Sequence, residues 1–137
     1  MKARTFTIHT DGGARGNPGP GAIGVVIREH GKTLQSFGAF IGERVTNNQA
    51  EYRAVEEALK KAKELGGTHL SVHLDSELVA NQLRREFKIK DRELSVLFVR
   101  VWNLMQGFKK VTFIVVPREK NYAADAEVNR VLDSAGY

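Results

Sequence analysis

Four acidic residues occupy positions from which a carboxylate is able to do chemistry: Asp11, Glu51, Asp75 and Asp125. Carboxylates transfer protons in general acid–base catalysis, and they are favoured ligands of hard cations such as Mg²⁺. The four residues are far apart in the chain, so a joint site depends on the elements that hold them.

Asp11 and Asp75 each end a predicted strand, residues 4–11 and 70–74 respectively. Successive side chains alternate between the two faces of a strand, and both acids fall on the polar face of their own strand. Ligands of open sheets bind outside the carboxyl ends of the strands. We therefore expect these two carboxylates to converge.

Glu51 lies on the apolar face of a predicted helix that begins near Asn48 and ends at Gly66 and Gly67. The other members of that face are Ala54, Val55, Ala58, Leu59 and Ala62. Burying an ionised carboxylate costs several kcal/mol unless a cation compensates for the lost water. The position of Glu51 therefore favours a bound cation.

Asp125 lies in the first turn of the last predicted helix, residues 122–134, on the same face as Val128 and Leu132. The structural alternative is an interaction with the helix dipole, worth about 0.3–1 kcal/mol. Four acids directed at one place would repel one another, and hard cations with oxygen ligands are the natural remedy.

The elements follow one another in an order typical of a mixed sheet. Period-two alternation predicts strands over 4–11, 23–29 and 34–41, with a tight turn at Gly31 and Lys32. The expected continuation is a helix from Asn48, a strand over 70–74, helices over 77–85 and 93–106, a strand over 111–116 and a helix over 122–134. Such an order favours an α/β domain, residues 1–137, whose first three strands are antiparallel.

Composition narrows the classes of function. The 137 residues include no cysteine, which excludes disulfides, thiolate zinc sites and thiol nucleophiles. A net charge of +5 favours polyanionic partners. The N-terminal residues show no apolar signal segment, so we expect a soluble protein of the cytoplasm with no membrane partner.

Six of the 13 glycines fall between Gly12 and Gly24, and the last three have the spacing of a dinucleotide-binding fingerprint. That interpretation fails because residues 25–27 continue as a strand, whereas the fingerprint opens a helix. A close-approach loop remains, in which glycines beside Asp11 let a backbone such as a sugar-phosphate come near. The structural alternative is a tight turn between strands.

Short motifs along the whole chain resemble those of ribonuclease H of type 1. They are Thr10-Asp11-Gly12-Gly13, Gly16-Asn17-Pro18-Gly19-Pro20-Gly21, Thr46-Asn47-Asn48-Gln49-Ala50-Glu51, Leu74-Asp75-Ser76 and Ala123-Ala124-Asp125. Each motif alone is weak, but all of them occur in order and on the elements predicted for them.

The resemblance implies an RNase H-like fold, with helices flanking a mixed five-stranded sheet, in a monomer. It implies that Asp11, Glu51, Asp75 and Asp125 bind two Mg²⁺ or Mn²⁺ ions about 3.5–4 Å apart. One ion would lower the pKa of the attacking water, and the other would stabilise the leaving 3′-oxygen. The implied reaction is hydrolysis of the RNA strand of an RNA/DNA hybrid, leaving 5′-phosphate and 3′-hydroxyl ends.

The resemblance also implies which residues contact the substrate. The positions that match contacts to the RNA 2′-hydroxyl are Gly12, Gly13, Asn17, Asn47, Asn48, Ser76 and Glu77, and those that match a DNA-phosphate contact are Arg44 and Thr46. Simpler alternatives are that Thr46 or Asn47 caps the helix of Glu51, and that Arg44 is a solvated cation.

Three departures from the family pattern are visible. The basic segment Arg84–Arg92 leads directly into the next helix, so the lysine-rich protrusion of better-known bacterial members is shortened or absent. Glu77 replaces a glutamine and cannot donate a hydrogen bond when ionised. No histidine lies in the loop before Asp125; Arg118 is the nearest substitute, suited to steering a phosphate but not to general base catalysis.

Other functions of the same fold are a hybrid-binding module without catalysis, a DNA nuclease or resolvase, and a nuclease that also cuts double-stranded RNA. Four intact acids near phosphates disfavour the first, and contacts to a 2′-hydroxyl disfavour the second. The sequence leaves the third open.

Overall fold

The computed structural model describes residues 2–85 and 88–137. In those ranges the strands are β1 (Thr5–Ala14), β2 (Gly19–Glu29), β3 (Lys32–Val45), β4 (His69–Leu74) and β5 (Lys110–Val115). The helices are α1 (Asn47–Leu65), α2 (Glu77–Leu83), α3 (Arg92–Met105) and α4 (Tyr122–Ser134), with a 3₁₀ turn, η1 (Arg118–Lys120), before α4.

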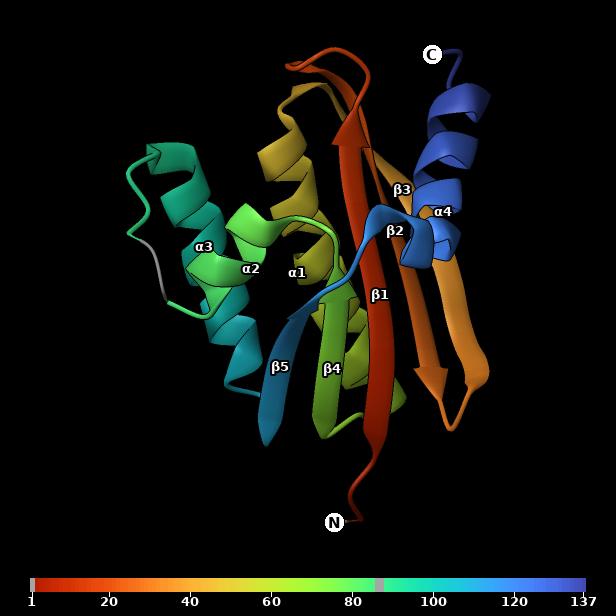
Figure 1. Ribbon diagram of the computed structural model, residues 1–137, viewed down its shortest axis with the longest axis vertical. Helices are drawn as coiled ribbons and strands as arrows, with labels where there is room; N and C mark the ends of the chain where they lie inside the picture. Colours follow the sequence, from red (N-terminus) through yellow and green to blue (C-terminus); the bar gives the residue numbers. More distant parts are fainter. Residues whose placement is uncertain (1, 86–87) are drawn as a thin grey trace.

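The strands form one sheet in the order β3-β2-β1-β4-β5 (Figure 1). The pairs β1–β2 and β2–β3 are antiparallel, whereas β1–β4 and β4–β5 are parallel. The turn between β2 and β3 contains His30 and Gly31, which both have positive φ, 51° and 79°. The predicted α/β fold with a mixed five-stranded sheet is confirmed.

Some boundaries differ from the predicted ones. Asp11 does not end its strand: β1 continues to Ala14 because its last residues still pair with β2. The strand β2 begins at Gly19, so most of the glycine-rich segment is strand and not the predicted loop. The helix α2 stops at Leu83, since Arg85 takes a left-handed φ of 64°.

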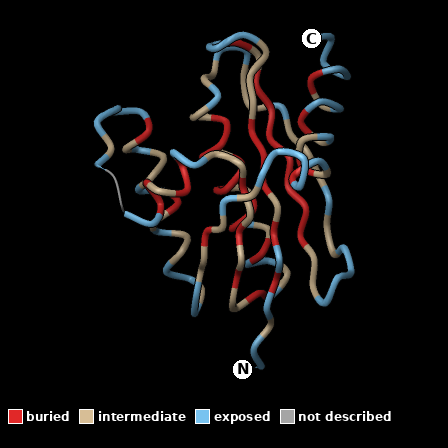
Figure 2. The backbone as a smooth tube through the Cα atoms, viewed as in Figure 1, coloured by how far each residue is buried: buried red, intermediate tan, exposed pale blue. Residues whose placement is uncertain are grey.

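Helices cover both faces of the sheet. In Figure 1 α1 lies behind the sheet with α3 beside it, and α4 lies in front of β2 and β3. The main core lies between α1 and the sheet, where Tyr52 and Leu59 share one cluster with Phe6, Ile8 and Val72. Figure 2 shows this burial as red segments along the central strands and the inner side of α1. The stripe predicted on α1 therefore faces the core.

Helix caps fix where α1 and α2 begin. The hydroxyl of Thr46 accepts a hydrogen bond from the Gln49 N–H (3.1 Å), and the Gln49 side chain accepts one from the Thr46 N–H (2.9 Å). This capping box satisfies two backbone donors at once. Ser76 caps α2 by accepting a hydrogen bond from the Val79 N–H (3.2 Å).

Two glycines bring helices unusually close to the sheet. A Cβ added to Gly12 would lie 2.2 Å from the backbone of Ala50 in α1, and one on Gly24 would lie 2.0 Å from the carbonyl oxygen of Ala124 in α4. The backbones that approach these glycines therefore belong to the chain itself, not to a ligand. Gly12 therefore allows the close approach of α1, which bears Glu51, to the sheet, and Gly24 allows that of α4, which bears Asp125.

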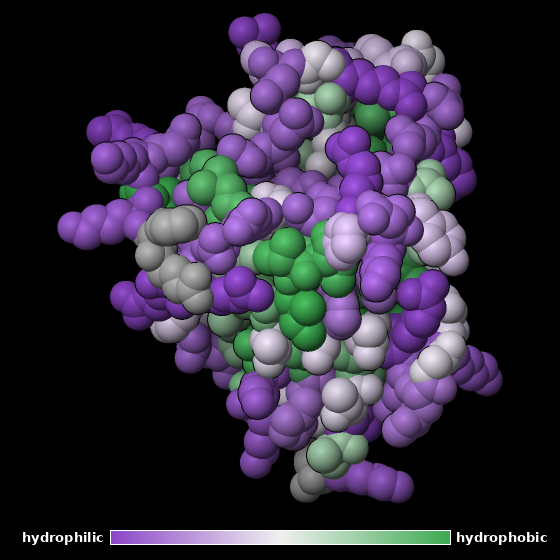
Figure 3. Space-filling view, viewed as in Figure 1, coloured by the Kyte–Doolittle hydropathy of each residue, from purple (hydrophilic) through white to green (hydrophobic). Residues whose placement is uncertain are grey.

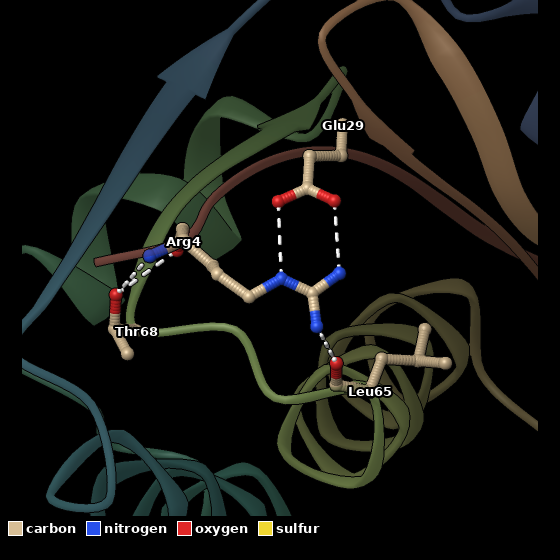
Figure 4. A network of polar contacts seen from close by, with 4 residues as sticks. All are labelled: Arg4, Glu29, Leu65 and Thr68. Carbon is tan, nitrogen blue, oxygen red and sulfur yellow. Dashed lines mark hydrogen bonds and ion pairs between the residues drawn. The ribbon is translucent and has the colours of Figure 1, made fainter. Parts of the chain in front are cut away.

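Hydrogen bonds and an ion pair of Arg4 fix the N-terminal end of β1 (Figure 4). The Arg4 guanidinium donates to both carboxylate oxygens of Glu29 (2.8 and 3.1 Å) and to the Leu65 carbonyl (2.6 Å). The Arg4 backbone also exchanges hydrogen bonds with the Thr68 hydroxyl. At this end every charge in the network has a partner of opposite sign.

The face of the molecule in Figure 3 is largely hydrophilic, with a hydrophobic area over β4 and β5. Val115, at the end of β5, is 38% exposed. None of the helices within 2–85 and 88–137 is long and apolar enough to cross a membrane.

Candidate metal-binding active site

Three carboxylates from three elements meet at the carboxyl end of β4. Asp11 comes from β1, Glu51 from the first turns of α1, and Asp75 from the residue after β4. One oxygen of each lies within 4.8 Å of the others. The structure therefore brings together three of the four acids expected at the site.

Strand register explains why Asp11 and Asp75 are neighbours. The parallel pairing of β1 with β4 aligns His9 with His73, and each acid lies two residues further along its strand. Two residues along a strand return to the same face. Glu51 reaches these acids from α1 because Gly12 lets the backbone at Ala50 approach β1.

Burial and repulsion between neighbouring carboxylates make the ionised forms of Asp11 and Glu51 costly. Burial, followed by the charges of Asp75 and Asp125, raises the pKa of Asp11 to about 7. Burial, followed by the charges of Asp11 and Asp75, raises the pKa of Glu51 well above its ordinary value. Without a cation, the protein therefore retains protons at a site rich in carboxylates.

Glu51 has little internal compensation for its burial. Its Oε1 accepts a hydrogen bond of 3.3 Å from the Gly12 N–H, and its Oε2 is buried with no hydrogen-bond partner among the described residues. A buried oxygen without a donor is unfavourable by a few kcal/mol. A divalent cation bound by the three acids would supply the missing interaction, so these residues fit such a metal.

Two stacked histidines lie on the strands that bear Asp11 and Asp75. The rings of His9 and His73 are 4.8 Å apart. Burial, followed by the charges of His73 and Arg28, lowers the pKa of His9 to about 4, and burial also lowers the pKa of His73. Both rings are therefore uncharged at neutral pH and do not offset the negative charge of the acids.

Asp125 lies at the edge of the three-acid cluster. It belongs to the first turn of α4, and it lines the same cavity as Asp11 and Glu51. Val128 and Leu132 line this cavity as well, so the face of α4 predicted from the sequence is the one turned toward the site.

Asn121 was missed by sequence reasoning, although it lies one helical turn before Asp125. It is 1% exposed, and its Nδ2 donates to the Thr10 carbonyl (2.8 Å) and to Asp75 Oδ2 (3.4 Å). Its backbone carbonyl accepts from the Asp125 N–H (3.1 Å). The side-chain amide of Asn121 therefore connects β1 to Asp75, and its backbone carbonyl connects to the first turn of α4.

A cavity of about 400 Å³ opens beside the acids and gathers most of the predicted substrate-binding residues. Of that set, its lining includes Gly12, Gly13, Asn47, Asn48 and Ser76, and Arg118, which was predicted separately, lines it as well. A neighbouring cavity of about 430 Å³ shares Asn47 and Asn48 and adds Asn17 and Thr46. Two residues of the set, Arg44 and Glu77, are exposed and line neither cavity.

Several of the predicted contact groups already bond within the protein. The side-chain oxygen of Asn47 accepts from the Ala14 N–H (2.9 Å), and the Asn47 N–H donates to the side-chain oxygen of Asn17 (3.0 Å). The Gly12 N–H is engaged by Glu51. Gly13 differs from Gly12, because a Cβ placed there meets only Val128, at 3.8 Å.

The basic segment Arg84–Arg92 is only partly described, since Glu86 and Phe87 lie outside the described residues. Arg84 donates two hydrogen bonds to the Phe113 carbonyl and so fastens α2 to β5. The Arg85 guanidinium lies over the Trp102 ring, 5.2 Å from its centre. Both arginines therefore have structural contacts.

Comparison with known proteins agrees with this geometry. Residues 9–131 match a family model described as reverse transcriptase-like. A bifunctional protein of Mycobacterium tuberculosis is 39% identical over 130 residues, which are 93% of this chain and 35% of that protein. A crystal structure of RNase H1 from Halobacterium salinarum superposes with a TM-score of 0.92 at 38% identity, covering 95% of this chain and 98% of the other.

A further solved structure, LC11-RNase H1 in complex with an RNA/DNA hybrid, has a TM-score of 0.91 at 38% identity and covers 96% and 99% of the two chains. The chain spans 35% of the length of the mycobacterial relatives and 63% of that of a curated ribonuclease HI from Halobacterium salinarum. The family match, the superposition and the cluster of acids lead to one conclusion: the chain belongs to the ribonuclease H type 1 family.

Proposed function

We propose that this protein hydrolyses the RNA strand of RNA/DNA hybrids, with divalent cations bound by Asp11, Glu51, Asp75 and Asp125. The observation on which the proposal rests is the group of three acids whose oxygens lie within 4.8 Å, together with the orphaned Oε2 of Glu51. Carboxylates held this close in a buried place are stable when hard cations neutralise them.

Two Mg²⁺ or Mn²⁺ ions, when bound, would lower the pKa of an attacking water and stabilise the leaving 3′-oxygen. The protein's own part is to hold the carboxylates in place. Strand pairing fixes Asp11 and Asp75, the capping box fixes the start of the helix that bears Glu51, and Asn121 ties the start of α4 to β1. Cleavage by this route leaves a 5′-phosphate and a 3′-hydroxyl.

The cavity beside the acids suits a ribose. The amide groups of Asn47 and Asn48 line it, and amides both donate to and accept from a hydroxyl. The Asn47 oxygen is engaged by Ala14, which leaves its NH₂ group to donate. A 2′-hydroxyl is the group that distinguishes RNA from DNA at such a place. LC11-RNase H1, a relative, was solved with an RNA/DNA hybrid.

The test is an end-labelled RNA/DNA hybrid incubated with the pure protein, with and without Mg²⁺ or Mn²⁺, beside DNA and RNA duplexes of the same sequence. We expect cleavage of the RNA strand of the hybrid only when a cation is present. We also expect Asp11→Asn and Asp75→Asn to bind the hybrid without cutting it. Binding without cleavage by the wild type would instead establish a hybrid-binding module, and equal cleavage of duplex DNA would establish a DNA nuclease.

We propose that Arg118 steers the scissile or departing phosphate, in place of the histidine of other family members. It is exposed, lies in η1 just before α4, and lines the cavity of the acids. Arg118→Ala should lower the turnover rate, whereas Lys120→Ala on the same 3₁₀ turn should not. Unchanged turnover and metal dependence in Arg118→Ala would show that Arg118 has no such role.

A further inference from the structure

The side-chain amide of Asn129, one helical turn after Asp125, links that acid to the turn between β1 and β2. The Nδ2 of Asn129 donates to Asp125 Oδ2 (3.2 Å), and the Asn129 Oδ1 accepts from the Arg15 guanidinium (3.3 Å). Residues four apart on a helix face the same way, so this contact needs no distortion of α4. Arg15 and Asn129 both line the cavity of the acids.

The chemistry of the two neighbours fixes the orientation of the amide. Arginine is only a donor, so it must face the Asn129 oxygen, and an ionised aspartate is only an acceptor, so it must face the NH₂ group. Flipping the amide would oppose donor to donor and acceptor to acceptor. Asn129 is therefore held in the one orientation that lets it donate to Asp125.

Arg15 is itself fixed at both ends. Its backbone N–H donates to the Pro20 carbonyl (2.8 Å), which closes the turn between β1 and β2. Its guanidinium pairs with Asp133 of α4 (2.7 Å). The side chain thus spans from the sheet to α4, and Asn129 lies between its guanidinium and Asp125.

We infer that Asn129 is a positioning residue for Asp125 and that Arg15 holds Asn129 in that role. The hydrogen bond occupies Oδ2 of Asp125, fixes the rotation of the carboxylate, and leaves Oδ1 for a cation. Of the four acids, Asp125 alone lies outside the 4.8 Å group, so its orientation decides whether it completes the site. The inference rests on the proposed function only in that cations bind beside Asp125.

The experiment compares Asn129→Ala, Asn129→Asp and Arg15→Ala with the wild type. Partners of metal ligands typically alter affinity by about 10-fold or more when removed. We expect Asn129→Ala to raise the Mg²⁺ concentration for half-maximal hybrid cleavage by about tenfold. Asn129→Asp, which keeps the shape but cannot donate, should behave alike. Arg15→Ala should give a smaller shift in the same direction.

A second measurement is independent of cleavage: the Mn²⁺ concentration that half-saturates the increase in Tm, measured without nucleic acid. It should rise in the same variants and remain unchanged in Asn103→Ala, an exposed asparagine on α3. A fall in metal-free Tm with no change in either metal midpoint would show a merely structural role and overturn the inference. If the wild type cuts no hybrid, the proposed function fails, and the Mn²⁺ measurement still decides the role of Asn129.

Discussion

Helix α1 buries two glutamates five residues apart, and their surroundings differ. Glu56 is 3% exposed; it accepts two hydrogen bonds from Arg100 (2.6 and 2.7 Å) and lies 3.4 Å from Arg53. Glu51 is 6% exposed; it has two acidic neighbours and one backbone N–H donor, and its Oε2 has no hydrogen-bond partner within residues 2–85 and 88–137. Glu56 connects α1 to α3, whereas Glu51 lies in the group of three acids that fits a bound cation.

The comparison shows that one helix carries a buried acid that stabilises the fold and another that fits a cation-binding role. A buried carboxylate with arginine partners contributes to the fold, and removing the partner leaves an uncompensated charge. A buried carboxylate among other carboxylates opposes the fold until a cation binds. The same residue type, on the same helix, should therefore respond in opposite ways to neutralisation.

The largest effect is expected from Glu51→Gln. Loss of a metal ligand removes several kcal/mol of transition-state stabilisation, so hybrid cleavage should fall by at least about 100-fold. Without metal, the variant should unfold at pH 7 at the same Tm as the wild type or a higher one, because burying an acid among other acids is costly whether it ionises or retains its proton. Kinetic assays and thermal unfolding measure the two effects, with Glu57→Gln on the same helix as the matched control. Full activity in Glu51→Gln would remove this acid from the site.

The next largest effect is expected from Gly12→Ala. The added Cβ would lie 2.2 Å from the Ala50 backbone, so α1 has to move away from β1 and take Glu51 with it. We expect a loss of about 1–3 kcal/mol in the free energy of unfolding, together with weaker metal binding. Gly13→Ala, whose Cβ meets only Val128 at 3.8 Å, is the control for stability. Equal stability of the two variants, measured by denaturant titration, would contradict the close packing described for Gly12.

Arg100→Ala should destabilise the fold without touching the site. It leaves Glu56 buried with Arg53 as its remaining cation, but Arg100 is 46% exposed, so solvent screens part of the interaction. We expect the free energy of unfolding to fall by about 1–2 kcal/mol. Cleavage per folded molecule should be unchanged. Recovery of stability on adding Glu56→Gln would confirm that the unpaired charge is the cause.

The pH dependence of stability should reveal the cost of burying Asp11 among other acids. Folding raises the pKa of Asp11 to about 7, so the metal-free native state binds more protons than the unfolded state between about pH 4 and 7. Stability from this group is therefore lost as the pH rises through that window. The Asp11→Asn variant should become progressively more stable than the wild type from pH 4 to 7 without metal. A constant difference across that range would contradict the raised pKa.

Much of the site was predictable because its residues conflict with their local patterns. Glu51 stands out on an apolar helix face, and Asp75 follows a strand at the edge where ligands bind. The sheet followed from alternation and from the order of strands and helices. The resemblance to the ribonuclease H family added the substrate contacts, which remain a prediction.

The parts that were not predicted depend on three-dimensional packing. The glycines at positions 12 and 24 suggested a loop open to a ligand, but the backbones of α1 and α4 occupy the space that side chains at these positions would fill. Asn121 and Asn129 lie four residues before and after Asp125; Asn129 shares the face of α4 that carries Asp125, and Asn121 is the residue that precedes the helix. That spacing was a signal in the sequence, but only the fold shows that Thr10 and Arg15 are their partners.

The most direct test of the central claim is to locate Mn²⁺ by its anomalous scattering in crystals of the wild-type protein. We predict a peak at bonding distance from oxygens of Asp11, Glu51 and Asp75, and its loss in Glu51→Gln. A clear map with no peak among these three acids at saturating Mn²⁺, or an unchanged peak in Glu51→Gln, would contradict the assignment of this cluster as the metal site.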